Sequence, residues 1–357
     1  MEAADLARVP AGGSLAVDRE RFSSHITRAL ETHKNVRVLR REVLALPEGP
    51  VVVASGPLTD GPLLEAIQRE TGREQLSFYD AAAPIVYKDS IDMDKAFRAS
   101  RYGRGEEGGD YINCPMDRQQ YESFYQALIE AKTAPVHGFE DSKVFEGCMP
   151  VEVMARRGHD TLCYGPLKPR GLKDPRTGKE PYAVVQLRRD NADGTVYNLV
   201  GFQTHLKWPE QKRVFSMIPA LKNAEFVRYG VMHRNTYLDS PRLLDAYYRV
   251  RGQERICFAG QITGVEGYVE STASGFVAGV ELANRLLGKP PVAFPRETAL
   301  GALAQYVSNE SVVDFQPMNI NFGIMPPLDH KVKGKRNKNA ELSRRSLELV
   351  DALREKL

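Results

Sequence analysis

Apolar and polar residues repeat with different spacings in different parts of this chain. The places where the spacing changes divide the chain into sections. Near the start, apolar residues recur at helical spacing and predict an amphipathic helix over 21–32 and a second helix over 62–71. Short runs rich in valine predict strands over 36–40 and 51–54. Helices that alternate with strands in this way predict an α/β segment.

Between about residue 83 and residue 246, β-branched and aromatic residues alternate with polar ones. Two such runs, 182–187 and 195–202, flank an Asp-Gly turn at 190–194 and predict a β-hairpin. Two helices are predicted to cover this sheet, over 119–133 and 208–217. The middle section therefore predicts an α+β domain.

An α/β pattern returns near residue 247 and continues to a C-terminal helix predicted over 340–356. The middle section thus interrupts a domain that contains both ends of the chain. We predict the first part of a dinucleotide-binding domain, an inserted α+β domain, and the second part of the first domain with the C-terminal helix, over 1–82, 83–246 and 247–357.

A glycine-rich turn follows the buried strand predicted over 255–259, and a helix is predicted to start around 270–273. Three glycines, Gly260, Gly264 and Gly267, leave backbone N–H groups bare near that helix N-terminus. The helix dipole and the unpaired donors together favour an anion or an electron-rich ring edge. The spacing fits a ligand-facing turn and a tight strand-to-helix connection equally well.

The composition agrees with a soluble globular protein. The 357 residues correspond to roughly two domains of about 150 residues, and 42% hydrophobic with 27% charged residues are ordinary values. No apolar run approaches the roughly 20 residues of a membrane-spanning helix, and the start lacks the apolar core of a signal peptide. We therefore expect a cytoplasmic protein with no membrane partner.

The cysteines are widely spaced and form no C-x-x-C pair, which argues against a metal site and against a disulfide framework. We expect free thiols at Cys114, Cys148, Cys163 and Cys257.

A net charge of +3 is too small to establish nucleic-acid binding, but the cations are clustered. The two clusters are Lys168, Arg170, Lys173, Arg176, Lys179 and Lys331, Lys333, Lys335, Arg336, Lys338. Such stripes bind phosphates in nucleic-acid-binding proteins, although solvated loops are the commoner explanation of charge runs.

Several motifs, in order along nearly the whole chain, resemble the folate- and FAD-dependent tRNA uracil-5-methyltransferases. They are R-V-P-A-G-G at 8–13, A-S-G-P-L-T at 54–59, Y-I-N-C-P-M at 111–116, F-E-G-C-M-P-V-E at 145–152, G-P-L-K-P at 165–169, Q-T-H-L-K-W at 203–208, G-V-M-H-R-N-T at 230–236, and G-Q-I-T-G-V-E-G-Y at 260–268 with S-T-A-S-G at 271–275. Eight motifs in the same order make a chance match improbable.

The resemblance implies an FAD-binding Rossmann-like domain, similar to that of glutathione reductase, interrupted by the inserted α+β domain. It also implies an enzyme that forms 5-methyluridine at position 54 of the tRNA T-loop. The carbon would come from 5,10-methylenetetrahydrofolate and the electrons from reduced FAD, with NADH or NADPH as the reductant. The expected partners are tRNA and folate.

One part of the family pattern has no counterpart near Met1. The family begins with a strand, a G-x-G-x-x-G turn and a helix that hold the FAD pyrophosphate. We therefore expect the first βαβ unit to be missing, and we expect the chain to purify colourless and to aggregate.

Cys148 is the candidate catalytic thiol. It lies between a glycine and the sequence Met149-Pro150, where a sharp turn would leave the side chain accessible. C5 of uracil becomes nucleophilic only after a group adds at C6, and a thiolate is suited to add and to leave. A second group must remove the C5 proton. The resemblance implies a catalytic role for Cys148, as nucleophile or as base.

The resemblance also implies the remaining site residues. The cofactor-binding residues are Gly260, Gln261, Gly264, Val265, Glu266, Gly267 and Tyr268. His205 and Tyr268 are expected to stack on the folate pterin, since a flat ring aligns with a flat ring. His233, Arg234 and Asn235 are candidate flavin or folate contacts. A structural histidine, a core tyrosine and a strand-end turn are the alternative interpretations of these residues.

Two other functions compete with this one. The first is the related class of flavoproteins that modify the wobble uridine of tRNA, which are expected to be longer and to end in a helical extension. The second is a fragment that binds tRNA without catalysis.

Overall fold

The computed structural model describes residues 1–12, 14–103, 108–134 and 149–354. The chain forms two compact units and passes through each of them twice. The first unit holds residues 1–40 and 79–233, and the second holds residues 41–78 and 234–357.

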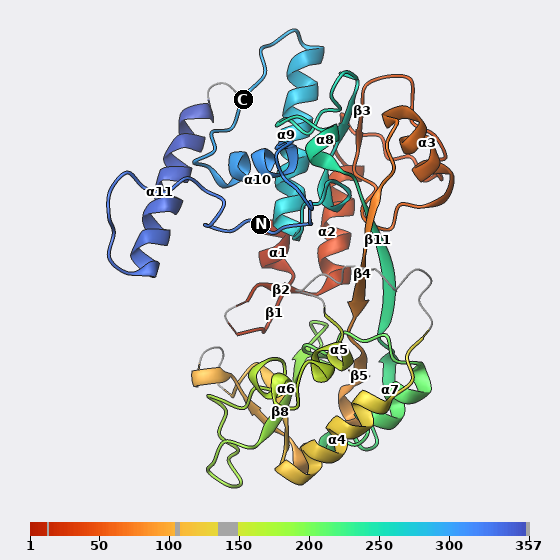
Figure 1. Cartoon of the computed structure of the whole chain (residues 1–357), viewed down its shortest axis with the longest axis vertical. Helices are drawn as coiled ribbons and strands as arrows, with labels where there is room; N and C mark the ends of the chain where they lie inside the picture. The colour runs from red at the N-terminus through yellow and green to blue at the C-terminus, as the bar shows by residue number, and fades with distance from the viewer. Residues whose placement is uncertain (13, 104–107, 135–148, 355–357) are drawn as a thin grey trace. The chain divides into compact units, whose positions relative to one another are not determined.

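An antiparallel sheet, of which β5 and β8 are labelled in Figure 1, forms the centre of the first unit. Its described strands follow the order β10-β5-β9-β8-β7-β6. These strands are β5 (Ile85–Tyr87), β6 (Phe97–Ala99), β7 (Tyr111–Met116), β8 (Ala183–Arg189), β9 (Val196–Leu199) and β10 (Phe226–Arg228). In the turn between β8 and β9, Asn191 accepts a hydrogen bond from the Thr195 amide at 3.0 Å. The predicted hairpin is therefore confirmed.

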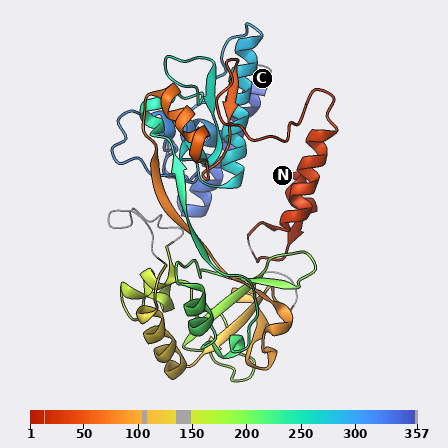
Figure 2. The same cartoon turned by 90° about the vertical axis from the view of Figure 1, so that its right-hand side faces the viewer.

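Helices cover this sheet and share one core with it (Figure 2). They are α4 (Arg118–Glu130), α5 (Val151–Arg156), α6 (Thr161–Tyr164) and α7 (Trp208–Phe215). Helix α4 begins with a capping box, in which the Asp117 carboxylate accepts from the Gln120 amide at 2.8 Å. Its buried face carries Tyr121, Phe124 and Leu128. The helices predicted over 119–133 and 208–217 are confirmed, with ends two or three residues earlier.

The N-terminal segment of the first unit contains α1 (Glu2–Leu6), β1 (Arg8–Val9), β2 (Ala16–Val17) and α2 (Arg19–Glu31). Asp18 caps α2 by accepting from the Arg21 amide at 3.0 Å, and its other oxygen accepts from the Ala192 amide at 2.8 Å. The Arg21 N–H and then the Ala192 N–H lower the pKa of Asp18. One carboxylate therefore joins the start of α2 to the turn between β8 and β9.

The predicted strand over 36–40 is wrong. These residues have no regular secondary structure, and Val36, Val38 and Leu39 are each at least 40% exposed. A run of alternating apolar residues becomes a strand only when it pairs with a neighbour and buries one face. Neither condition holds here among the described residues.

The second unit is built on two parallel strands, β3 (Val51–Val53) and β12 (Ile256–Phe258), in the register Val51 to Ile256. Its helices are α3 (Gly61–Thr71), α8 (Ser240–Leu243), α9 (Tyr268–Leu286), α10 (Ala299–Ser308) and α11 (Lys335–Leu353). These elements confirm the strands predicted at 51–54 and 255–259 and the helices predicted at 62–71 and 340–356. The mixed α/β class of the prediction is confirmed as well.

Short 3₁₀ helices complete the described secondary structure, at η1 (Lys88–Ser90), η2 (Met93–Lys95), η3 (Arg101–Gly103), η6 (Pro219–Leu221) and η7 (Gly260–Thr263). The chain passes between the units through β4 (Leu76–Ala82) and β11 (Val231–Tyr237), which pair with each other. None of the described helices is long and apolar enough to cross a bilayer. The predicted domain limits at residues 82 and 246 stay a prediction.

Candidate functional site

The glycine-rich turn after β12 depends on backbone conformations that side chains disfavour. Gly260, Gly264 and Gly267 have φ angles of +77°, +78° and +102°. A Cβ at Gly264 would lie 2.6 Å from the ring of Phe315, so this position has no space for a side chain. Part of the glycine pattern is therefore explained by the turn and its packing.

The turn lies where other segments of the second unit converge. Because β3 and β12 are parallel, the segments that follow them, 54–59 and 259–267, leave the sheet at the same edge. The Thr236 amide donates to the Pro57 carbonyl at 2.7 Å, and the Leu238 amide donates to the Ile262 carbonyl at 2.8 Å. The end of β11 therefore lies along both segments.

Asn235 directly precedes Thr236 on β11 and is only 3% exposed. Its Oδ1 has no hydrogen-bond partner among the described residues. Buried polar atoms almost always have a partner, so an unmet acceptor favours a bound ligand or water here. Arg234 is exposed on the same strand, while His233 belongs to the first unit.

The first turn of α9 adds a second buried polar atom without a described hydrogen-bond partner. Ser271 has a buried Oγ that lacks a hydrogen-bond partner in the described part of the chain. A Cβ at Gly260 would lie 3.8 Å from the Ser271 Cβ, so the two residues are neighbours. The Gly260 amide donates to Ser274 Oγ at 2.8 Å. The N-cap of α9 is Gly267, and no side-chain cap is present there among the described residues, so the dipole at this N-terminus favours an anion.

The predicted cofactor residues divide into two kinds. Val265 is completely buried, and its neighbours Gly264 and Glu266 exchange backbone hydrogen bonds with Met318 at 3.0 and 2.9 Å. Tyr268 is 82% exposed at the start of α9. Gln261 Nε2 donates to Glu266 Oε2 at 3.2 Å. The Val265 side chain therefore belongs to the core, and Tyr268 presents a free aromatic surface.

In the first unit, His205 is held by a buried carboxylate. The His205 Nδ1 lies 2.6 Å from Glu152 Oε1, and the His205 amide donates to the same oxygen at 2.9 Å. Thr204 Oγ1 donates to Glu152 Oε2 at 2.9 Å. Glu152 is completely buried and His205 is 6% exposed. The ring of His205 is thus oriented by Glu152.

Glu152 was not predicted as a site residue. It occupies the first turn of α5, where the Val151 amide donates to the Gln203 carbonyl at 2.7 Å and joins the helix to the Thr204-His205 segment. Its position at the end of the F-E-G-C-M-P-V-E motif was the available signal. Cys148, in the same motif, lies outside the described residues, and its role stays a prediction.

The three described cysteines have thiols that resist ionisation. Burial raises the pKa of Cys257 to about 11 and also raises the pKa of the completely buried Cys114. Burial raises the pKa of the half-buried Cys163 as well. All three are free thiols, and a protonated thiol is a weak nucleophile, which agrees with structural roles.

The comparisons with known proteins agree over most of the chain. The family model for glucose inhibited division protein A matches residues 1–290. The methylenetetrahydrofolate–tRNA-(uracil-5-)-methyltransferase TrmFO of Acetivibrio thermocellus is 59% identical over 351 residues, which cover 98% of this chain and 80% of the relative. The protein of the same name from Anoxybacillus flavithermus is 56% identical over 357 residues, which cover 100% of this chain and 82% of the relative.

Solved structures show the same fold at lower identity. Aquifex aeolicus GidA in its form I crystal superposes with a TM-score of 0.65 at 17% identity, over 98% of this chain and 65% of that one. The form II crystal gives a TM-score of 0.64 at 16% identity, with 98% and 62% covered. This chain thus spans slightly less than two thirds of GidA. The chain belongs to the glucose inhibited division protein A family and, within it, to the methylenetetrahydrofolate–tRNA-(uracil-5-)-methyltransferases.

Proposed function

We propose that this chain is an enzyme that methylates C5 of a uridine in tRNA, with 5,10-methylenetetrahydrofolate as the carbon donor. The observation that carries the proposal is the identity of 59% to the relative from Acetivibrio thermocellus over 98% of this chain. That relative is named for this donor, this class of RNA and this atom of the base. The likeness to GidA, at 16–17% identity, supports the fold alone.

FAD fits the edge of the sheet formed by β3 and β12. The unmet Oδ1 of Asn235 and the unmet Oγ of Ser271 are polar atoms that a flavin cofactor could satisfy. The backbone from Gly260 to Gly267, together with the N-terminus of α9, would hold it. When bound, the flavin supplies the electrons that convert the transferred methylene to a methyl group. NADH or NADPH would reduce it.

Tyr268 is proposed to give the pterin of the folate a flat surface. Its ring is largely exposed and stands at the start of α9, directly after the glycine turn. His205 is proposed to contact the folate through a ring that Glu152 orients. Because the His205 Nδ1 lies 2.6 Å from Glu152 Oε1, the Nδ1 edge of the ring faces the carboxylate and the Nε2 edge faces away from it.

The chemistry at the base needs two groups from the protein. One group adds at C6 and makes C5 nucleophilic, and another removes the C5 proton after the carbon unit is attached. Cys148 is proposed for one of these two roles. The described thiols are poor alternatives, because burial raises the pKa of Cys114, Cys163 and Cys257.

The test is a methylation assay with the chain, labelled methylenetetrahydrofolate, NADH or NADPH, and an unmodified tRNA transcript. FAD is added in excess, because the chain is expected to purify colourless. We expect labelled 5-methyluridine in the digested tRNA. A transcript with cytidine at position 54 is the control and should remain unlabelled if the T-loop uridine is the target. Absence of 5-methyluridine, under conditions in which the Acetivibrio thermocellus relative forms it, would contradict the proposal and leave a tRNA-binding protein as the alternative.

A further inference from the structure

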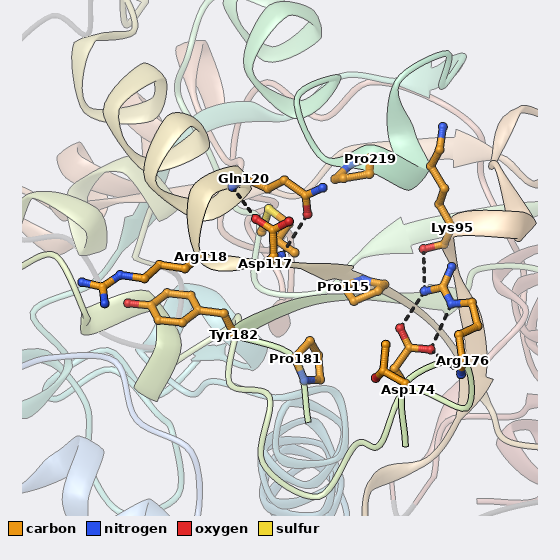
Figure 3. A pocket seen from close by; sticks show the side chains of 12 residues that line it. Lys95, Pro115, Asp117, Arg118, Gln120, Asp174, Arg176, Pro181, Tyr182 and Pro219 are labelled. Atoms are coloured by element: carbon orange, nitrogen blue, oxygen red, sulfur yellow. Dashed lines mark hydrogen bonds and ion pairs between the residues drawn. The ribbon is translucent and has the colours of Figure 1, made fainter. Parts of the chain in front are cut away.

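A pocket of about 570 Å³ lies at the start of α4 in the first unit (Figure 3). Its volume is within the range of about 300–1,000 Å³ that is typical of ligand sites. Pro115, Pro181 and Pro219 give it apolar walls, and Tyr182 stands beside Pro181. The centroid of the Tyr182 ring lies 5.3 Å from that of Tyr121, which is completely buried and fixes the position of the outer ring. The pocket thus offers flat apolar surfaces on a rigid base.

Cationic side chains lie at two ends of these walls. Figure 3 shows Arg118 beside Tyr182 and Lys95 beyond Pro115. The Arg118 guanidinium lies 6.0 Å from the centroid of the Tyr182 ring, within the range of a cation–π contact. The side chains of Arg118 and Lys95 are 76% and 49% exposed. Both charges are therefore accessible to an anionic ligand.

The two carboxylates that line the pocket are already used inside the protein. Asp174 is 5% exposed and accepts from Arg176 Nε at 3.0 Å and from Arg176 Nη2 at 2.7 Å. Asp117 accepts from the Gln120 amide in the cap of α4. Because these charges are satisfied by internal donors, they oppose an incoming anion only weakly.

Two surface ion pairs also involve the cations of the pocket. Lys95 lies 2.8 Å from Asp92, and Arg118 lies 3.6 Å from Glu122. Pairs of this kind between exposed side chains are weak, so both cations can turn towards a stronger anion such as a phosphate.

The segment that carries Asp174 and Arg176 extends the positive charge beyond the pocket. Its further cations are all exposed, at Lys168, Arg170, Lys173 and Lys179. In the part of the chain that the structure describes, no ion pair involves any of these four side chains. A single small anion would not contact so many cations, whereas a polyanion gains affinity from each cation that it contacts.

We propose that this pocket binds a nucleotide of the tRNA other than the reacting uridine, with its base against Tyr182 and the prolines and its flanking phosphates at Lys95 and Arg118. Stacking of a base on an aromatic ring tolerates every base, so the pocket would hold the tRNA without selecting a sequence. The proposal rests on the proposed function, because tRNA is the occupant.

The experiment measures binding of an unmodified tRNA transcript to the 357-residue chain over a series of salt concentrations. Lys95→Ala and Arg118→Ala should each weaken binding and lower the slope of log affinity against log salt by about 1, because each removes one phosphate contact. Tyr182→Leu should weaken binding by about fivefold or more and leave the slope unchanged, since stacking releases no counterion. Lys212→Ala, an exposed lysine on α7 that does not line the pocket, is the control and should change neither quantity by as much.

The outcomes separate this inference from the proposed function. Unchanged affinity and slope in the double variant Lys95→Ala/Arg118→Ala, with the fold confirmed by circular dichroism, would overturn the pocket proposal and leave the proposed function intact. Failure of the unaltered chain to bind tRNA at all would overturn both. Competition of uridine monophosphate with tRNA, lost in Tyr182→Leu, would support the proposal, because the free nucleotide and the tRNA nucleotide would share the pocket. Binding of uridine monophosphate that depends on Tyr182 but does not displace tRNA would assign the pocket to a free nucleotide and overturn the commitment to tRNA.

Discussion

The Nδ1 of His205 and the Oε1 of Glu152 lie 2.6 Å apart, and both side chains are buried. The two residues are 53 positions apart in sequence, and both belong to the 79–233 segment of the first unit. Burial of a carboxylate costs free energy unless donors surround it, and here Thr204 and the His205 backbone supply further hydrogen bonds. This arrangement makes Glu152 a positioning residue for His205.

Replacement of Glu152 by Gln should lower the free energy of unfolding by about 2–3 kcal/mol, because the amide keeps only one acceptor oxygen in a site of three donors. Urea unfolding measures the loss. The control is Glu210→Gln, which breaks an ion pair of 2.6 Å with the half-exposed Arg213. That surface pair should contribute less than about 1 kcal/mol. Equal stability of the Glu152 variant and the unaltered chain would show that the buried contact is not made in solution.

Replacement of Tyr268 by Ala should raise the KM for methylenetetrahydrofolate by roughly 2- to 12-fold, which corresponds to the loss of one ring–ring contact of about 0.5–1.5 kcal/mol. Stability should not change, since the side chain is 82% exposed. Tyr164, 83% exposed on α6, gives a matched control, and Tyr164→Ala should leave the KM unchanged. A Tyr268 variant that loses tRNA affinity and keeps its KM for folate would place this residue in a different site.

Replacement of Gly264 by Ala should lower the free energy of unfolding by about 2 kcal/mol or more. The position combines a φ of +78° with a Cβ that would lie 2.6 Å from the Phe315 ring, so strain and overlap add. Gly279, inside α9, has open space where a Cβ would lie, and Gly279→Ala should raise stability by up to about 1 kcal/mol. Thermal unfolding of the two variants should therefore shift in opposite directions. A shift in the same direction would show that the turn relaxes around the new side chain.

Replacement of Cys148 by Ala should abolish formation of 5-methyluridine and leave the visible absorbance of any bound flavin unchanged, because the proposed role of the thiol is at the uracil ring. The control is Cys163→Ala, which removes a half-buried thiol and should retain methyl transfer. Near-normal activity of the Cys148 variant would remove this residue from the catalytic proposal.

Alkylation should show that the Cys257 thiol is protonated in the folded protein at pH 8. Burial raises the pKa of Cys257 to about 11, so at pH 8 the folded protein holds this thiol protonated and iodoacetamide should leave it unmodified. In urea the same thiol should react, since its ordinary pKa is near 8.5. The raised pKa also means that the contribution of Cys257 to stability is complete below about pH 8.5 and is lost as the pH rises towards 11. Peptide mass spectrometry measures the modification. Rapid labelling of Cys257 at pH 8 in the folded chain would contradict the raised pKa.

The sequence pattern predicted the long helices and strands because apolar residues recur in them at regular spacing. The helix at 62–71, the hairpin around 190–194 and the strand-turn-helix at 255–273 are all present. It failed at 36–40, where alternation alone could not reveal that the segment finds no partner strand among the described residues. Long-range pairing depends on tertiary structure, which a local pattern does not contain.

The site was predicted less completely than the fold. The glycine turn was located by its spacing, but the overlap that Gly264 avoids with Phe315 joins residues 51 positions apart and has no local signal. Glu152 was overlooked for the same reason, because a lone glutamate reads as a surface residue until its burial is known. The acceptor of Asn235 became informative only when its burial and lack of a described partner were seen.

The double role of Asp18 has a consequence for the order in which the protein folds during synthesis. Its second acceptor bond comes from Ala192, which is 174 residues later in the chain. At about 5–20 residues per second, a ribosome needs roughly 10 to 35 seconds to add that distance. During this interval Asp18 can accept the hydrogen bond from Arg21 but not the one from Ala192. Residues 41–78, which belong to the other unit, are made in the same interval. The start of α2 is thus secured to the β8–β9 turn only after the chain has been made as far as Ala192.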